Sequence, residues 1–303
     1  MDRISIITVH YNQPEVTVAF LTSVRKYCAT LPVEVILVDN APVQDYEPRF
    51  KTAYPELVYI RSDQNTGFAG GNNLGIRQSK GEYILLLNND TELTEGFLET
   101  LIETMESNPQ IGLLSPLIKF FHEKDRIQYA GFTKMNYYTG RNNTIGYYEP
   151  DRGQYHKDYE TGFCHGAAML CRKQDLQKAG LMEELYFLYY EELDWCEKFK
   201  RIGKKTWFTG KAQIYHKESA SVGKMSPVKS YFMTRNRMLY IRRNAPFFPK
   251  LVFTLYYSLL VCPVKIIKLL LQSNTSLALQ TFRGLKWNFT HSKNSDHLGY
   301  PIP

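Results

Sequence analysis

The segment FLYYEELDWCEKF places three acids, Glu191, Glu192 and Asp194, among aromatic residues at the start of a predicted helix. A carboxylate in apolar surroundings has a raised proton affinity, which suits a general base that takes the proton of an incoming hydroxyl. The ordinary alternative is a cluster that complements the positive end of the helix dipole, which explains one or two acids better than three. We therefore treat all three acids as candidate catalytic residues.

Oxygen-bearing side chains also follow the apolar run YILLL, which predicts a buried strand over Tyr83 to Leu87. Asn88, Asn89 and Asp90 would then stand at the carboxyl edge of a sheet, where open α/β folds bind their ligands. Amide and carboxylate oxygens suit Mg²⁺ or Mn²⁺, and because only one of the three is charged, the metal should arrive with a substrate diphosphate. A turn that caps the following helix is the structural alternative.

One histidine offers a further metal ligand. His216 follows the predicted strand Trp207 to Tyr215, at an edge that could rejoin Asp90. Imidazole is an acceptable ligand for Mn²⁺, although a lone histidine is more often structural.

Two other strand ends suit a nucleotide. Asp39 ends the predicted strand Val33 to Val38, and its carboxylate can accept hydrogen bonds from a base or ribose without being catalytic. The exit of the first strand, Thr8 to Asn12, would lie beside Asp39 and close over the base. An aspartate at a strand end is also common in simple turns, so this position alone is a weak signal.

The loop NTGFAGGNNLG, residues 65 to 75, contains four glycines and three asparagines ahead of a helix predicted over Asn72 to Gln78. Such a loop could bring backbone amides close to a ligand. Its spacing matches neither the P-loop nor the GxGxxG pattern, so by itself it does not identify a nucleotide site.

Alternating strand-like and helix-like patterns position these groups and predict an α/β fold with a parallel sheet covered by helices. The middle segment, residues 119 to 160, is rich in Tyr, Asn and Gly and favours hairpins and a binding loop, or an aromatic-rich surface insertion. Besides those named above, the predicted strands are Ile4 to Val9, Leu57 to Ile60, Ile111 to Pro116 and Gly166 to Cys171, and the predicted helices are Pro14 to Tyr27, Gly96 to Ser107 and Gln174 to Ala179.

Charge is distributed unevenly along the 303 residues. Residues 1 to 199 contain 19 Lys/Arg against 28 Asp/Glu, a balance of −9, whereas residues 200 to 303 contain 18 against 2, a balance of +16. The basic end predicts an anionic partner such as a membrane surface or a diphosphate. We expect no nucleic-acid partner, because no recognition motif is present.

The five cysteines include no CxxC pair, which favours buried free thiols in a reducing compartment over a zinc site. No signal peptide is expected, because the chain goes straight from MDR into a strand. Hydrophobic residues make up 44% of the chain and charged residues 22%, which indicates a globular protein rather than a disordered one.

The last part of the chain differs in character. A helix with a basic face is predicted over Tyr231 to Arg243, followed by the uncharged run Leu251 to Val264. This run of 14 residues is interrupted by Pro263 and is shorter than the about 20 residues of a spanning helix. With Lys250, Lys265 and Lys268 at its edges, it suits a helix lying in a membrane interface. A core helix or a dimer-interface helix is the alternative.

Seven motifs follow one another along the chain: ISIITVHYN, VILVDN, NTGFAGGNN, LLLNNDTEL, GAAMLCRK, FLYYEELDWC and IYHKESAS. Together, and in this order, they resemble the family 2 inverting glycosyltransferases with a GT-A fold, especially rhamnosyl- and galactofuranosyltransferase-like members. The resemblance spans about residues 3 to 243 and implies a Rossmann-like, mostly parallel sheet flanked by helices. It implies a GT-A domain over 1 to 225, with a nucleotide-sugar half to about 115 and an acceptor half from about 116, and a helical, membrane-associating extension over 226 to 303.

The resemblance also assigns roles to residues. It implies metal ligation by Asp90 and His216, and it makes Glu192 the base. The family usually has Glu-Asp or Asp-Asp where this chain has two glutamates, and this difference leaves Glu191 or Asp194 possible as the base. Asn88 is a second difference from the family, at the first position of its metal-binding motif, and this difference affects the expected metal dependence. Arg235 could contact the diphosphate, or equally a surface or membrane. The nucleotide-sugar positions are Thr8, His10, Tyr11, Asp39, Asn65, Gly67, Asn72, Asn88, Asn89, Gly166 and Arg235.

The expected reaction is a single displacement with Mg²⁺ or Mn²⁺ as cofactor. A dTDP- or UDP-sugar, with dTDP-rhamnose first among donors, would give its sugar to a glycan or polyprenyl-diphosphate-linked glycan in cell-surface polysaccharide synthesis. The expected location is cytoplasmic, peripheral on the inner face of the cytoplasmic membrane, with a homodimer possible. The alternatives are a nucleotidyltransferase and a catalytically silent sugar-nucleotide-binding protein.

Overall fold

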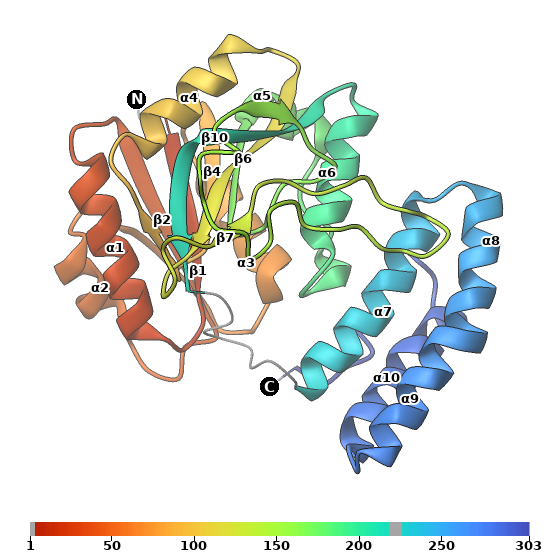
Figure 1. Cartoon of the computed structure of the whole chain (residues 1–303). Helices are drawn as coiled ribbons and strands as arrows, with labels where there is room; N and C mark the ends of the chain where they lie inside the picture. Colours follow the sequence, from red (N-terminus) through yellow and green to blue (C-terminus); the bar gives the residue numbers. More distant parts are fainter. Residues whose placement is uncertain (1–3, 218–225, 303) are drawn as a thin grey trace.

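The computed structural model describes residues 4 to 217 and 226 to 302. Within them, ten strands form one sheet in the order β3-β2-β1-β4-β9-β6-β10-β5, with β7 beside β6 and β8 beside β10 (Figure 1). The strands are β1 (Ile4–His10), β2 (Val33–Asn40), β3 (Val58–Ser62), β4 (Tyr83–Leu87), β5 (Thr91–Leu93), β6 (Ile111–Phe120), β7 (Ile127–Tyr129), β8 (Asp158–Glu160), β9 (Ala168–Arg172) and β10 (Lys205–His216). Residues 218 to 225, with the end of the IYHKESAS motif and the expected domain boundary, lie outside the described residues.

The sheet is mixed rather than wholly parallel. Strands β3, β2, β1 and β4 run parallel to one another, and β6 and β10 are parallel to each other. Strand β9 lies between β4 and β6 and is antiparallel to both, so β4 and β6 point the same way. The carboxyl ends of β1, β2, β4, β6 and β10 therefore meet at one edge of the sheet, as the sequence analysis expects of an α/β fold.

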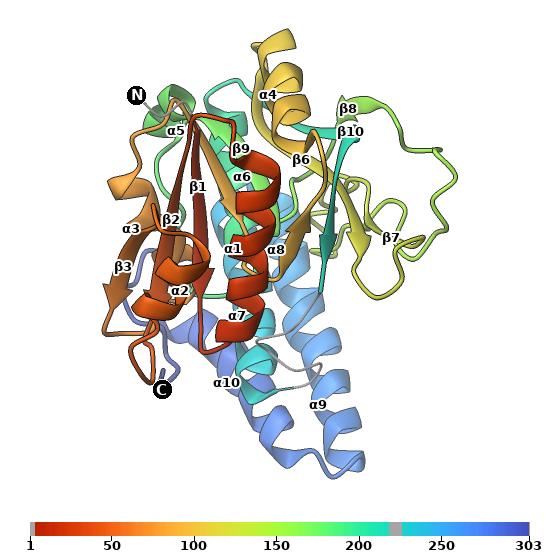
Figure 2. The same cartoon turned by 90° about the vertical axis from the view of Figure 1, so that its left-hand side faces the viewer.

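Helices cover both faces of the sheet, as the alternating pattern predicts (Figures 1 and 2). Neighbouring residues of one strand point to opposite faces, so Ile6 packs with α1, α2 and α4, whereas Ile7 packs with α3, α5 and α6. These helices are α1 (Pro14–Cys28), α2 (Glu47–Ala53), α3 (Gly67–Gln78), α4 (Phe97–Ser107), α5 (Lys173–Ala179) and α6 (Glu191–Arg201).

The glycine-rich motif is mostly helix, not an open loop. Helix α3 begins at Gly67, five residues before the predicted start, so Gly70, Gly71 and Gly75 lie inside it. A Cβ at Gly71 would lie 2.8 Å from a methyl of Val9, and one at Gly75 would lie 2.4 Å from a methyl of Ile7. Gly71 and Gly75 therefore let α3 pack closely on β1, and the contact of this segment's backbone amides with a ligand stays a prediction.

The C-terminal part is helical, and the helix predicted over 231 to 243 falls within α7. The expected break at Pro263 is wrong: helix continues from Phe247 to Leu271, 25 residues that by length and composition are apolar enough to cross a membrane. A π-helical turn directly before Pro263 is a common way to absorb such an irregularity. The elements are α7 (Pro227–Asn244), α8 (Phe247–Tyr256), the π-helical turn (Tyr257–Val261), α9 (Cys262–Leu271) and α10 (Thr275–Thr290).

Between β6 and β9, a long insertion contains β7 and β8 and extends toward α7 and α8 (Figure 1). Arg237 of α7 holds its tip, with Nε donating to the carbonyl of Gly140 at 3.1 Å and Nη2 to that of Thr139 at 2.6 Å. The predicted hairpin and loop character is confirmed, and the insertion joins the sheet to the C-terminal helices.

Candidate active site at the carboxyl edge of the sheet

The predicted metal ligands meet although they are far apart in sequence. Asp90 follows β4, His216 ends β10, and the antiparallel pairing of β10 with β5 opposes His216 to Thr91. His216 Nε2 lies 3.0 Å from Asp90 Oδ1, and both side chains are almost fully buried. The pairing of β5 with β10 thus places one carboxylate and one imidazole together at the sheet edge.

The contacts of His216 bear on which of its ring nitrogens faces Asp90. His216 Nδ1 lies 2.8 Å from Gln128 Oε1, which can only accept, so this contact favours the tautomer with its proton on Nδ1 and its Nε2 lone pair toward Asp90. Asp90 Oδ1 is buried without a hydrogen-bond donor. Two facing acceptors fit a divalent ion, and such an orienting partner is typical of metal-bound histidine. Among the described residues no group of three metal-ligating side chains occurs, so substrate oxygens would complete the shell.

The amides beside Asp90 have different partners. Asn88 holds the site together through its backbone, because its N–H donates to the carbonyl of Ala167 at 3.0 Å. Asn89 turns inward, where its amide donates to Thr17 Oγ1 of α1 at 2.7 Å. Asn89 is thus a support for the strand end, rather than the ligand-facing group that the sequence analysis expects.

Unpartnered polar atoms gather where β1 and β2 end. Thr8 Oγ1, His10 Nε2 and Asp39 Oδ1 are buried without hydrogen-bond partners, and His10 is opposite Asp39 in the strand register. The second oxygen of Asp39 accepts from the Tyr59 hydroxyl at 2.5 Å. Burial raises the pKa of Asp39 to about 6 and lowers the pKa of His10 to about 4. His10 Nδ1 is bonded to Thr17 Oγ1 at 2.7 Å, so only Nε2 is unpartnered, 3.9 Å from Asp39 Oδ1. This pair of unpartnered atoms suits a nucleoside that supplies the missing hydrogen bonds.

Several predicted nucleotide positions lie nearby but are used within the fold. Asn65 Oδ1 accepts from the Gly67 N–H at 3.0 Å, in the turn that starts α3. The Asn72 amide donates to the Phe68 carbonyl one turn earlier at 2.9 Å, so Asn72 faces its own helix. Tyr11 is half-buried directly after β1, at the same edge as His10.

The two glutamates begin α6 at the end of a strained segment. Phe187, Tyr189 and Tyr190 all have positive φ, between 63° and 76°, which non-glycine residues rarely adopt. Such strain concentrates at functional sites, where surrounding contacts must hold it. Here the Asn236 amide donates to the carbonyls of Tyr186, Leu188 and Tyr189 at 2.8 to 2.9 Å. No sequence pattern singled out Asn236.

Glu191 and Glu192 each present an unpartnered, buried Oε2. Burial, with the neighbouring Glu192, raises the pKa of Glu191 well above its usual value, and burial also raises the pKa of Glu192. A Cβ at Gly166 would lie 3.7 Å from Glu192 Cγ, and Ala167, the next residue, binds Asn88. Short contacts thus connect Glu192 to the segment that holds Asp90.

The structure does not bring Asp194 and Arg235 into this group. Asp194 Oδ1 accepts from the Tyr186 hydroxyl at 3.2 Å and from the Asn244 amide at 2.8 Å. Arg235 is fully buried and donates to the carbonyls of Leu185, Tyr186 and Leu298. Both residues hold the segment before α6 against α7. A diphosphate contact for Arg235 is wrong in this geometry, because the side chain is fully buried and bonded to carbonyls. Asp194 Oδ2 is buried without a partner, so a base role for Asp194 stays a prediction.

Two residues near the metal candidates, one buried and one half-buried, carried no sequence signal. Gln128 of β7 orients His216, as described above. His165 stacks on Phe132 and its ring centroid lies 5.9 Å from that of His216. Burial lowers the pKa of His165 to about 3, so its ring is neutral. Only the tertiary structure places either residue beside His216.

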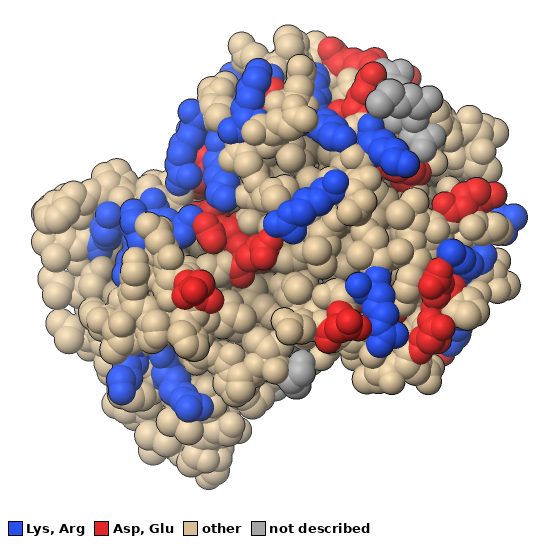
Figure 3. Space-filling model, turned by 180° about the vertical axis from the view of Figure 1, so that it is seen from behind, with Lys and Arg blue, Asp and Glu red and all other residues tan. Residues whose placement is uncertain are grey.

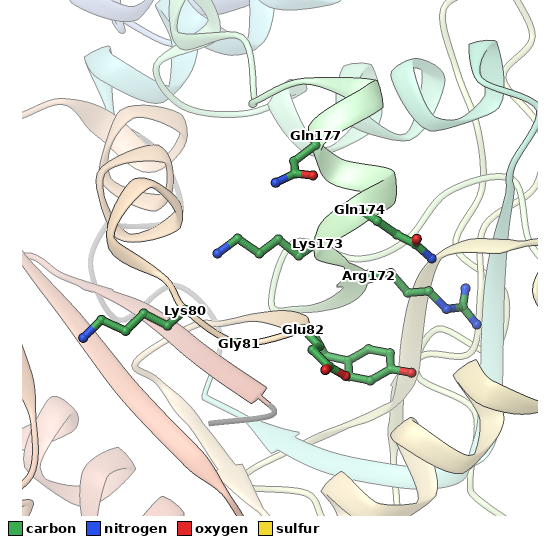
Figure 4. A pocket seen from close by; sticks show the side chains of 8 residues that line it. Lys80, Gly81, Glu82, Arg172, Lys173, Gln174 and Gln177 are labelled. Atoms are coloured by element: carbon green, nitrogen blue, oxygen red, sulfur yellow. The ribbon is translucent and has the colours of Figure 1, made fainter. Parts of the chain in front are cut away.

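A hollow of about 480 Å³ lies at the opposite edge of the sheet, between the start of β4 and the start of α5 (Figure 4). Its lining includes Arg172 and Lys173, but Arg172 donates to the carbonyls of Ile111 and Met105, and Lys173 donates to that of Ser79. This hollow has neither a carboxylate pair nor a metal-ligand pair, so we place the candidate active site at the carboxyl edge.

Several known proteins are similar to this chain. A low-salt glycan biosynthesis hexosyltransferase from Haloferax volcanii is 26% identical over 66% of this chain but only 62% of its own length, less than two thirds. An N-acetylglucosaminyl-diphospho-decaprenol L-rhamnosyltransferase from Mycobacterium tuberculosis is 22% identical, with 74% of this chain and 78% of the relative aligned. A dTDP-rhamnosyl transferase from Shigella flexneri is 24% identical, with 69% of this chain and 71% of the relative aligned.

Solved structures show the same fold. A mannosyltransferase from Pyrobaculum calidifontis, in complex with GDP-Man and Mn²⁺, superposes with a TM-score of 0.59 at 14% identity, over 95% of this chain and 87% of its own. The model of the family described as Glycosyl transferase family 2 matches residues 5 to 180, which include β1, the Asp90 segment and Gly166. With more than half of the chain matched, this protein belongs to glycosyl transferase family 2.

Proposed function

We propose that this glycosyltransferase is an inverting, metal-dependent enzyme that transfers rhamnose from dTDP-rhamnose to a polyprenyl-diphosphate-linked glycan. The observation that carries the proposal is the pair of facing acceptors, Asp90 Oδ1 and His216 Nε2, with Glu192 connected to the same segment through Gly166 and Ala167. The names of two relatives support rhamnose, one of them supports dTDP, and one supports a lipid diphosphate acceptor.

Asp90 and His216 would hold a divalent ion, Mg²⁺ or Mn²⁺, together with the donor diphosphate. When bound, this ion would neutralise charge that develops on the leaving nucleoside diphosphate. Gln128 keeps His216 in the tautomer that offers Nε2, and Asp39, His10 and Thr8 would bind and orient the nucleoside. Mn²⁺ in the superposing mannosyltransferase supports a divalent cofactor of this kind.

Glu192 is the base in this proposal. It is partly exposed beside Gly166, whereas Glu191 is only 3% exposed and has a pKa raised by burial and by Glu192, so Glu191 stays protonated. A raised pKa lets Glu192 accept the acceptor hydroxyl proton near neutral pH. Attack of that hydroxyl from the face opposite the diphosphate inverts the anomeric centre.

The C-terminal helices are proposed to rest on an anionic membrane. An apolar face runs along α8, the π-helical turn and α9, and Leu259 and Leu271 are 74% and 82% exposed on it. Only 17% of the most apolar window between Phe247 and Leu271 is buried, unlike a core helix. Seen from behind, this lobe shows basic side chains on a largely uncharged surface (Figure 3). The apolar face consists of Phe247, Phe248, Leu251, Leu255, Leu259, Leu260, Val264, Ile267, Leu270 and Leu271.

A donor screen tests the proposal. Purified protein is incubated with Mn²⁺ or Mg²⁺, a lipid-linked acceptor extract and a panel of dTDP-, UDP- and GDP-sugars, and release of nucleoside diphosphate is measured. We expect release from dTDP-rhamnose, lost on chelation, and reduced about 100-fold or more in Glu192→Gln. Glu103→Gln, on the exposed face of α4, is the matched control and should equal wild type. Equal rates in wild type and Glu192→Gln would refute the assignment of the base.

A further inference from the structure

Three cations lie on the segments that meet where the insertion packs against α7 and α9. They are Arg141 at the tip of the insertion, Arg237 in α7 and Lys265 in α9, here named the cationic cluster. Arg237 and Lys265 are half-buried and Arg141 is exposed. Lys265 is predicted from the sequence to flank a membrane helix, but its ammonium turns inward and lies 3.3 Å from Thr234 Oγ1 of α7.

Contacts fix the relative positions of the three. Arg237 Nε donates to the carbonyl of Gly140, the residue directly before Arg141, at 3.1 Å. Its guanidinium carbon also lies 5.0 Å from the ring centroid of Tyr257, in the π-helical turn that leads into α9. Thr234, the contact of Lys265, is three residues before Arg237 on α7, so the two side chains leave the same face of that helix.

The cluster lacks a countercharge within the protein. Among residues 4 to 217 and 226 to 302, no ion pair involves Arg141, Arg237 or Lys265. Other partly buried cations do have carboxylates, for example Arg243 with Glu183 and Lys204 with Asp175. Burial and the charge of Arg237 lower the pKa of Lys265, as expected for like charges held together. Such an arrangement is costly unless an anion completes it.

The position of the cluster identifies the anion. Tyr190, directly before Glu191, links it to the site, because its ring centroid lies 5.9 Å from that of Tyr240, three residues after Arg237 on α7. Burial raises the pKa of Tyr190 to about 12, Arg237 and Arg141 act to lower it, and Glu192 acts to raise it. On the other side, α9 carries Lys265 next to Val264 of the exposed apolar face. A ligand bound here would have its phosphate between the proposed base and an apolar surface.

We propose that the cationic cluster binds the diphosphate of the lipid-linked acceptor, so that its glycan reaches toward Glu192 while its isoprenoid chain follows the apolar face of α8 and α9. This inference rests on the proposed function and assigns its acceptor subsite. Arg141 and Lys265 contribute free charge, whereas Arg237 also holds the tip of the insertion through two carbonyls. The same cations could meet phospholipid headgroups, which share the phosphate chemistry, and the experiment separates these two sources.

The test measures binding of farnesyl diphosphate to the full chain by calorimetry, with dTDP and Mn²⁺ saturating so that the donor site is filled. We expect Arg141→Gln/Lys265→Gln to weaken binding about tenfold or more, because two charged hydrogen-bond donors are lost. The matched control, Arg152→Gln/Lys286→Gln, removes two exposed cations from the same insertion and from neighbouring α10 and should bind as wild type. Arg141→Lys/Lys265→Arg keeps the charges and should retain most of the affinity, which excludes misfolding as the cause.

Two further arms identify the source of the phosphate. Farnesol, which lacks the diphosphate, should bind both double variants equally, and sedimentation with phosphatidylglycerol vesicles should fall no more in the cluster variant than in the control. Equal farnesyl diphosphate affinity in the two double variants overturns the inference, as does a loss confined to vesicles. Release of dTDP from dTDP-rhamnose without acceptor is measured separately, so failure of the proposed function is seen independently of the cluster.

Discussion

Gln128 offers a sharp test of the metal site, because it contacts His216 and has no contact with substrate in the proposed mechanism. Its amide oxygen is the acceptor that fixes the His216 proton on Nδ1, at 2.8 Å, and leaves Nε2 facing Asp90. Gln128→Met has a similar size but removes this acceptor, so His216 can adopt the tautomer that protonates Nε2. In that tautomer Nε2 donates to Asp90 Oδ1 and no longer ligates a metal.

The expected magnitude follows from the role of such orienting partners. Their loss typically costs 10- to 100-fold in metal affinity, or about 1.4 to 2.7 kcal/mol. The assay titrates Mn²⁺ against nucleoside diphosphate release and reads the half-saturating Mn²⁺ concentration and the maximal rate separately. We expect the half-saturating concentration to rise 10- to 100-fold while the rate at saturation falls much less.

Gln128→Glu is the matched variant, because a carboxylate still accepts from Nδ1 and should keep or strengthen Mn²⁺ binding. A Gln128→Met enzyme with unchanged Mn²⁺ dependence and normal activity would show that the His216 tautomer does not matter for the metal. The assignment of His216 as a ligand would then fall, and the Asp90 contact would be an ordinary buried ion pair.

Three further outcomes follow from the packing and charges. Gly71→Ala should destabilise the fold by about 1 to 3 kcal/mol in urea unfolding, because its Cβ would lie 2.8 Å from Val9; wild-type stability would contradict the close helix–strand packing. Burial raises the pKa of Asp39 from 3.8 to about 6, so its contribution to the unfolding free energy falls as pH rises from about 4 to 6, whereas His10, whose pKa burial lowers to about 4, contributes the opposite slope over this range. In urea titrations the unfolding free energy of Asp39→Asn should therefore change with pH with a more positive slope than that of wild type, and equal slopes would contradict the raised pKa of Asp39. Leu259→Glu should reduce sedimentation with anionic vesicles at least several-fold while Val43→Glu, equally exposed on the sheet domain, should not; equal binding by both would remove α8 and α9 from the membrane contact.

Local sequence patterns determined much of the fold. Alternation of apolar strands and amphipathic helices predicted the first four parallel strands and the helices on both faces, because each element must bury its apolar side. Five cysteines without a CxxC pair predicted buried free thiols, and all five are buried and free. Asp90 was also identifiable, since a carboxylate directly after a buried strand is placed at the sheet edge by the strand itself.

Local sequence patterns missed the packing of residues whose surroundings depend on contacts between distant segments. The glycines of α3 resembled a ligand loop, but Gly71 and Gly75 are small because Val9 and Ile7 approach the helix closely. Arg235 resembled a site residue, but its guanidinium is buried and donates to the carbonyls of the segment before α6. A charged residue near a motif can face substrate or interior, and spacing along the chain does not distinguish the two.

The sequence by itself determined the type of fold, the family resemblance and the position of Asp90 and Glu192 at element ends, because these depend on short-range periodicity. Only the tertiary structure decided that His216 meets Asp90, that Gln128 sets its tautomer, and that Arg237 and Lys265 converge without a carboxylate. These contacts join residues tens to more than a hundred positions apart. They depend on how β10 returns beside β5 and how α9 folds back on α7, which no local pattern encodes.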